Sequence, residues 1–160
     1  MRHAHSLDTP RISATGLQPM RALSLWQPWA SLCFTFLKKH ETRHWGTDYR
    51  GPLAIHAAQK LVTDLNDQLL DLLCDEFGGH WARDLPRGRM LGIVDLTDCR
   101  ATEALDVDAI DRLCGNFEPG RFAWRLDNPR LFEDPPEVKG RQGFFTWPMA
   151  PTNPEKGSLK

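Results

Sequence analysis

The stretch Leu37-Lys38-Lys39-His40-Glu41-Thr42-Arg43-His44-Trp45 decides how this chain is interpreted, because it joins a predicted helix to a predicted strand. The segment before it, residues 29–39, follows a proline that suits a first helical turn and is apolar over most of its circumference. After it, Glu41, Arg43 and Trp45 alternate, and on a strand every second side chain shares one face. The stretch therefore predicts that these three side chains point together, beside a lysine that leaves the helix.

Two interpretations of this cluster remain open from the stretch alone. In the first, Lys38, Glu41 and Arg43 line a pocket for a polar small molecule or a nucleic acid, with Trp45 beside them. In the second, the charged residues form a local ion pair and Trp45 belongs to the core, since charge clusters are often structural. Lys38 has the alternative role of a solvated cation at a helix end, where the helix dipole favours positive charge.

The pattern on either side of this stretch predicts an α+β fold. Predicted strands cover residues 21–26, 41–45, 52–58, 90–97, 122–126 and 143–147, and predicted helices cover residues 29–39, 63–77 and 106–114. An irregular turn is expected at residues 129–136. Because strands outnumber helices, and the helices are inserted between them, we expect a curved or closed, mainly antiparallel β-barrel with two or three peripheral helices.

Length and charge set further bounds. The 160 residues are enough for one domain with its own core, which we place at residues 20–148. Residues 1–19 are expected to be a disordered or vector-derived extension, and residues 149–160 a flexible tail. With 20 basic and 21 acidic residues, the chain is not a globally basic nucleic-acid binder, so any such role rests on a local patch.

Four cysteines are spread widely along the chain, at Cys33, Cys74, Cys99 and Cys114. They are expected to be reduced thiols of a cytoplasmic protein. A zinc site made of Cys99, Cys114 and a histidine is an alternative that the spacing does not favour, so neither a metal nor a cofactor is predicted. No apolar run approaches membrane-spanning length, and no membrane association is expected.

Three motifs follow one another in the chain: Ser24-Leu25-Trp26-Gln27-Pro28-Trp29-Ala30-Ser31, then Lys38-x-x-Glu41-x-Arg43, then Tyr49-Arg50-Gly51-Pro52-Leu53-Ala54-Ile55-His56-Ala57-Ala58. With the later Val138-Lys139-Gly140-Arg141-Gln142-Gly143-Phe144-Phe145, they resemble the ASCH (activating-signal-cointegrator homology) family over about residues 21–147. The resemblance implies a PUA-like β-barrel with helices packed around it and a cleft lined by the Lys-x-x-Glu-x-Arg residues. It also implies RNA, nucleosides or nucleic acid as ligands.

Two positions depart from the family pattern. Phe36 stands where the family usually has glycine, two residues before the lysine, which would narrow access to Lys38. Glu41 stands where some bacterial relatives that hydrolyse acetylated cytidine have threonine. A carboxylate cannot simply replace a hydroxyl nucleophile, because it would form an anhydride and would need different activation. This departure puts that chemistry in question for this chain.

The leading hypothesis is a domain that binds RNA or a modified nucleoside in a small cleft. An indole would stack on a base, which is worth roughly 1–3 kcal/mol per base, while cations meet phosphate or polar base edges. The predicted binding residues are Trp26, Trp29, Lys38, Glu41, Arg43, Trp45, Tyr49 and Arg50.

Two alternatives accompany this hypothesis, and the sequence leaves open whether the chain is an enzyme. A metal-independent ribonuclease or an amidohydrolase of modified nucleosides would use Lys38 and Glu41 for acid–base chemistry, assisted by Tyr49 or His56. A lone histidine such as His56 is, however, more often a hydrogen-bonded core residue. A protein-interaction adaptor would instead show an apolar surface patch. The ligand's identity and any protein partners are not predicted.

Overall fold

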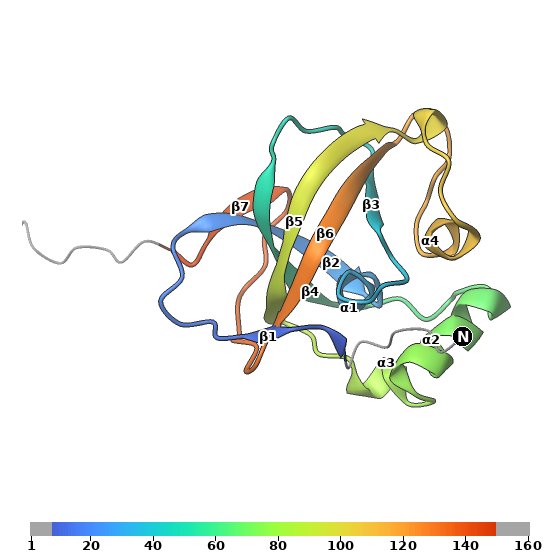
Figure 1. The fold of residues 1–160 in the computed structure, drawn as a ribbon. Coiled ribbons are helices and arrows are strands. Elements are labelled where there is room, and N and C mark those ends of the chain that lie inside the picture. Colours follow the sequence, from blue (N-terminus) through green and yellow to red (C-terminus); the bar gives the residue numbers. More distant parts are fainter. Residues whose placement is uncertain (1–7, 150–160) are drawn as a thin grey trace, which may run out of the picture.

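One mixed sheet forms the centre of the molecule (Figure 1). The structure is a computed structural model that describes residues 8–149. Within these residues the sheet has seven strands. They are β1 (Arg11–Ile12), β2 (Met20–Gln27), β3 (His40–Arg43), β4 (Gly51–Leu61), β5 (Arg89–Ala101), β6 (Phe122–Phe132) and β7 (Phe144–Trp147).

The strands run in the order β1-β6-β5-β4-β2-β7, and β3 pairs with β6 outside this path. Four of the six pairings are antiparallel, but β2 pairs with β4, and β1 with β6, in parallel. The α+β class and the largely antiparallel pairing therefore agree with the sequence. The closed barrel is not confirmed, because among the described residues β1 and β7 end the path without pairing with each other.

Four α-helices lie outside the sheet in the described part of the chain: α1 (Trp29–Leu32), α2 (Asp67–Phe77), α3 (Trp81–Asp84) and α4 (Ala109–Leu113), with a short 3₁₀ turn η2 at Thr102–Ala104. The longest helix, α2, is capped by Asn66, whose side chain accepts from the Leu69 amide, and Gly78 ends it with a positive φ of 89°. Its apolar face meets α1 and α3 in a cluster that includes Leu32, Leu73 and Trp81.

The predicted first helix is too long, because α1 covers only four residues. At its start the Gln27 side chain accepts from the Ser31 amide at 3.0 Å, which satisfies one of the free donors of a helix N-terminus. At its end the Thr35 hydroxyl donates to the Leu32 carbonyl and accepts from the Leu37 amide, so the chain turns instead of continuing as a helix. The apolar run that suggested a long helix is a short helix followed by a buried turn.

The predicted irregular turn at residues 129–136 is wrong in its first part, because β6 continues to Phe132. Pro129 falls within a register shift of the β5–β6 pair, between Asp127 and Arg130, where the ladder does not need its missing amide proton. Beyond this shift, the pairing of β1 with β6 brings Arg11 opposite Leu131.

Residues 8–19, expected to belong to an extension, pack against the domain. The Thr9 side chain is buried and donates to the Phe34 carbonyl at 2.6 Å, and β1 follows directly. Residues 1–7 and 150–160, which cover the rest of that predicted extension and most of the predicted tail, lie outside the described residues. Within the described range, no helix is long and apolar enough to cross a membrane.

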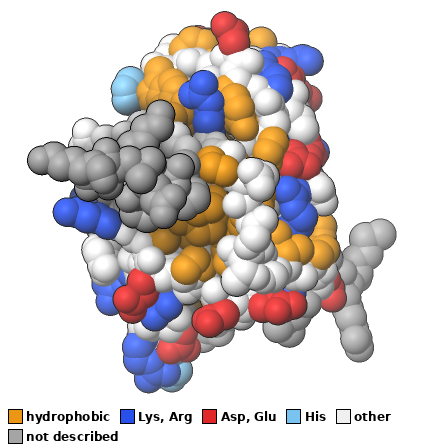
Figure 2. All heavy atoms as spheres, turned by 90° about the vertical axis from the view of Figure 1, so that its left-hand side faces the viewer, with side chains coloured by type: hydrophobic (Ala, Val, Ile, Leu, Met, Phe, Trp, Pro, Cys, Tyr) orange, Lys and Arg blue, Asp and Glu red, His pale blue; other side chains and the backbone are white. Residues whose placement is uncertain are grey.

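The face around β7 combines apolar surface with charge of both signs. Figure 2 views this side and shows hydrophobic side chains gathered in its middle, with acidic and basic side chains around them. The core cluster nearest to it contains Phe132 and Trp147 and is flanked by the partly buried Leu17, Met20 and Phe145. Because both signs are interspersed here, this face does not resemble the continuous basic surface that duplex binding requires.

A buried hydrogen-bonded pair, Asp111 and His40, attaches α4 to β3. The Asp111 carboxylate accepts from the Lys39 and His40 amides at 2.7 and 3.2 Å, and its other oxygen lies 2.7 Å from Nδ1 of His40. The Asp111 side chain is only 1% exposed. Burial alone would raise the pKa of Asp111, but the His40 ring and the two amides outweigh it and lower the pKa below its usual value.

We expect Asp111→Asn to destabilise the protein in a pH-dependent manner, by about 1.5–3 kcal/mol at pH 6, the usual worth of a hydrogen bond to a charged group. Because the folded pKa lies below the unfolded one, this stability is present above about pH 4 and is lost as the pH falls through the folded value. Urea unfolding of both proteins between pH 3 and 7 measures this gap. The exposed Asp75→Asn is the control, and a gap that stays constant with pH contradicts the assignment.

Candidate functional site

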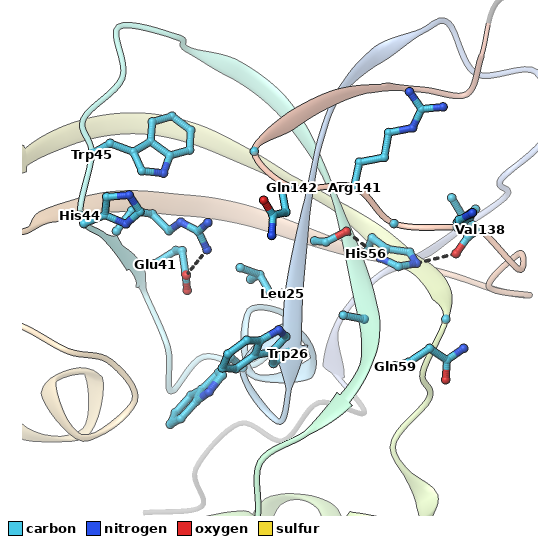
Figure 3. Close-up of a pocket in the computed structure, with 18 residues that line it drawn as sticks. Leu25, Trp26, Glu41, His44, Trp45, His56, Gln59, Val138, Arg141 and Gln142 are labelled. Atoms are coloured by element: carbon cyan, nitrogen blue, oxygen red, sulfur yellow. Dashed lines mark hydrogen bonds and ion pairs between the residues drawn. The ribbon is translucent and has the colours of Figure 1, made fainter.

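A pocket of about 1000 Å³ opens beside β2 and β4 (Figure 3). Figure 3 shows Glu41 and Trp45 on one side of it and His56 and Gln142 on the other, with Trp26 near the helical end. The lining residues come from β2, α1, β3 and β4, from the positions just after β3 and just before β5, and from the loop before β7. They are Ser24, Leu25, Trp26, Trp29, Glu41, Arg43, His44, Trp45, His56, Ala58, Gln59, Gly88, Val138, Lys139, Gly140, Arg141, Gln142 and Gly143.

Three indoles contribute to this lining, those of Trp26, Trp29 and Trp45, and the sequence left open which of them belong to the core. Trp26 is 49% exposed, and the Lys60 ammonium lies 3.7 Å from the centre of its ring. Trp29 and Trp45 are half-buried, and Trp45 packs edge-on against Trp124 in the core. Trp26 therefore has the most exposed ring of the three, and the face that Lys60 does not cover is the one that suits stacking on a planar ligand.

Glu41 and Arg43 form the charged wall of the pocket. They are two residues apart on β3, and both line the pocket together with Trp45, just beyond the strand. The Arg43 guanidinium lies 3.6 Å from Glu41 Oε1 and 6.0 Å from the centre of the Trp45 ring. A carboxylate that holds a guanidinium in place prepares it for a phosphate or a base edge.

Lys38 lies behind this wall and is not part of the lining. Its ammonium group donates to the His40 carbonyl at 2.8 Å and to the Cys114 carbonyl at 2.9 Å, and it lies 3.2 Å from Glu41 Oε2. Burial alone would lower the pKa of Lys38, but the Glu41 carboxylate outweighs it and raises the pKa above its ordinary value. Lys38 is therefore a buried cation that fixes Glu41, neither solvated at a helix end nor exposed to a ligand.

Phe36 and two other residues singled out in the sequence also lie outside the pocket lining. Phe36 is 48% exposed, so about half of this residue faces solvent. The Tyr49 hydroxyl donates to the Pro52 carbonyl, and its ring packs against Phe144. Arg50 donates to the carbonyls of Thr47 and Tyr49, which orders the turn before β4.

His56 lies on the opposite wall and connects β4 to two other segments. Its Nε2 lies 2.6 Å from the Val138 carbonyl oxygen, and its Nδ1 lies 2.8 Å from the Ser24 hydroxyl. The residue is 2% exposed although its ring borders the pocket. Burial lowers the pKa of His56, and the bond to Val138 offsets this only in part. The ring is therefore neutral at pH 7.

Sequence reasoning missed Ser24 and much of the loop from Val138 to Gly143 as pocket components. Ser24 lies opposite His56 because β2 and β4 pair in parallel, and no local pattern predicts a parallel register between them. The loop carries Lys139 and Arg141, but its position across the pocket depends on tertiary bonds of Val138, whose carbonyl accepts from His56 and whose amide donates to the Gly88 carbonyl. A glycine in a polar segment, Gly140, was the available signal of a close backbone approach.

Cysteines do not form a metal site in the part of the chain described. No group of three His, Cys, Asp or Glu side chains there is arranged to hold a metal ion. Cys33 and Cys114 are buried, and burial raises the pKa of both thiols, to about 11 for Cys114. Both are therefore protonated packing residues at neutral pH.

Comparison with known proteins identifies the family. The ASCH domain model matches residues 23–136, which is more than half of the chain. The chain therefore belongs to the ASCH domain family. It is also 39% identical over 80 residues to activating signal cointegrator 1 of Homo sapiens and, to the same extent, of Mus musculus. The match covers 48% of this chain and only 14% of either relative.

Lys38 and Lys39 offer a matched test of the buried ion pair. Lys38→Met is expected to destabilise the protein by about 3–5 kcal/mol, because it leaves the buried Glu41 without its closest cation. Lys39→Met, which removes an exposed pair with Asp108, is expected to cost no more than about 1 kcal/mol. Urea unfolding of the two variants at pH 7 gives both values. Equal stabilities would show that Lys38 is not the buried anchor described.

Proposed function

We propose that this ASCH domain binds RNA by holding one base of a single-stranded segment in the pocket. The observation that carries this proposal is the combination of the exposed Trp26 ring with the Glu41–Arg43 pair in one cavity. Family membership supports it, because the resemblance implies RNA or nucleoside ligands. We also propose that the fold is related to the PUA-like barrel, and that the mixed sheet described above is a variant of that barrel in which the end strands do not pair.

The two walls have complementary tasks in this proposal. The base stacks on Trp26, while the Glu41 carboxylate accepts from an amino or imino group on the base edge. Arg43, held by Glu41, donates to an acceptor on the same base or to its phosphate. Trp29 and Trp45 exclude water from the space between them. A cavity of about 1000 Å³ has room for a nucleotide and leaves space for its neighbours.

Charge limits the size of the binding site. The cations that line the pocket are Arg43, Lys139 and Arg141, and the chain as a whole has a net charge of −1. Three phosphate contacts on a single strand give a slope of log K against log salt of about −2. We therefore expect a small footprint and a weak dependence on salt, unlike that of a protein that tracks a long duplex.

The hydrolase alternative with Lys38 as an acid or base draws no support from this geometry. A Lys ammonium has three protons, and Lys38 directs them toward two carbonyls and the Glu41 carboxylate. Proton transfer to a substrate would break this network. The pocket side of Glu41 is therefore assigned to binding.

Short RNAs titrated against the wild type and Trp26→Ala test the stacking role. The variant is expected to bind about 5- to 150-fold more weakly, which corresponds to roughly 1–3 kcal/mol for one stacked base. Phe36→Ala is a matched control, because Phe36 is 48% exposed but lies outside the pocket. Fluorescence anisotropy with a labelled octanucleotide at several salt concentrations gives the affinities and the slope.

Arg43→Ala is expected to weaken the binding of the same RNA by at least about 10-fold, because it removes a charge-assisted donor from the pocket. Arg83→Ala is its control, since this arginine lies on α3, away from the lining. Equal affinities of wild type, Trp26→Ala and Arg43→Ala would place any RNA binding elsewhere on the molecule and overturn the proposal.

A further inference from the structure

The Ser24–His56 pair is a second chemical feature of the pocket. The parallel register of β2 and β4 sets Ser24 opposite His56, and Ser24 Oγ lies 2.8 Å from Nδ1 of the ring. A carbonyl oxygen only accepts hydrogen bonds, so the 2.6 Å contact with Val138 places the ring proton on Nε2. Nδ1 is then free to accept the proton of the Ser24 hydroxyl.

This tautomer has the properties of a general base. The Val138 carbonyl orients the ring and stabilises the proton on Nε2 when Nδ1 becomes protonated. Burial keeps the neutral form of His56 populated at pH 7. A hydroxyl bonded to a neutral, oriented imidazole is the arrangement by which serine nucleophiles are activated.

Backbone donors lie on the segment next to this pair. A Cβ at Gly140 would lie 2.4 Å from Ser24 Oγ and 2.6 Å from Nδ1 of His56, so only glycine allows the loop to pass this closely. Among residues 8–149, the amides of Gly140, Arg141 and Gln142 donate to no protein acceptor. Free amides beside a nucleophile can stabilise a developing oxyanion.

We propose that Ser24 is a nucleophile, that His56 is its general base, and that the pocket hydrolyses a carboxylic ester. Ser24 Oγ attacks the ester carbonyl carbon while its proton passes to Nδ1 of His56. The tetrahedral intermediate collapses, its C–O bond breaks, and the departing alcohol takes the proton from Nδ1. Water then attacks the acyl-serine with His56 as base, which releases a carboxylic acid and restores the Ser24 hydroxyl.

An acyl substrate fits the surroundings better than a phosphoryl group. Phosphoryl transfer relies on cations that neutralise the charge on the equatorial oxygens. Of the three cations that line the pocket, Arg141 is directed away from His56 (Figure 3) and Arg43 pairs with Glu41 on the opposite wall, which leaves Lys139 alone on the loop beside His56. An uncharged carbonyl needs only the base and oxyanion donors. This activity goes beyond the proposed RNA binding and does not depend on it.

A fluorophosphonate probe and p-nitrophenyl acetate test this proposal on the full chain. The probe is expected to label wild-type protein at Ser24, identified by mass spectrometry of tryptic peptides. Labelling is expected to rise with pH through the pKa of His56, with a midpoint below 6.5. His56→Gln removes the base but can still donate to Val138, and it is expected to lower the labelling rate by about 100-fold or more.

The controls separate catalysis from a purely structural role of the pair. Ser24→Ala is expected to abolish labelling and the serine-dependent release of p-nitrophenol, and Ser13→Ala, the same change at an exposed site, is expected to leave both unchanged. The proposal is overturned if wild-type Ser24 is not labelled, or if its labelling persists at full rate in His56→Gln. RNA titration of Ser24→Ala reports separately on the proposed function.

Discussion

A buried ammonium group is stable only if an opposite charge lies nearby and its protons have hydrogen-bond acceptors. Lys38 meets both conditions. The side chain is 1% exposed, yet two carbonyls and the Glu41 carboxylate surround its nitrogen. One carbonyl belongs to β3 and the other to the residue that ends α4. The ion therefore joins the turn after α1 to both elements, and the His40–Asp111 pair strengthens the same junction.

This junction determines how the Glu41 and Arg43 side chains are oriented in the pocket. Glu41 directs one carboxylate oxygen toward buried Lys38 and the other toward Arg43, so a structural ion pair and a binding wall share one side chain. On the far wall, His56 links β4 to Ser24 on β2 and to the loop at Val138. The two walls thus rest on separate networks, and a ligand can be bound by one while chemistry takes place on the other.

The sequence predicted the parts of this molecule that depend on local pattern. The alternation of Glu41, Arg43 and Trp45 led to one shared face, and the leucines of α2 led to a helix. It did not predict the burial of Lys38, because the Cys114 carbonyl that accepts its proton comes from a distant segment. Nor did it pair Ser24 with His56, since the parallel β2–β4 register is a tertiary feature. Pro129 suggested a turn, because proline usually interrupts a strand. In the structure a register shift of the β5–β6 pair accommodates it inside β6.

The indole signals of the six tryptophans test the central claim most directly. Their ¹⁵N–¹H resonances, assigned by single Trp→Phe changes, are followed in NMR spectra while a short single-stranded RNA is added. The account predicts that the indole resonance of Trp26 shifts most and that those of the pocket residues Trp29 and Trp45 shift less. The resonances of Trp81 and Trp147, which are buried core residues outside the pocket lining, are expected to stay unchanged. Shifts confined to Trp81 or Trp147, or no shift of Trp26 at saturation, would contradict it.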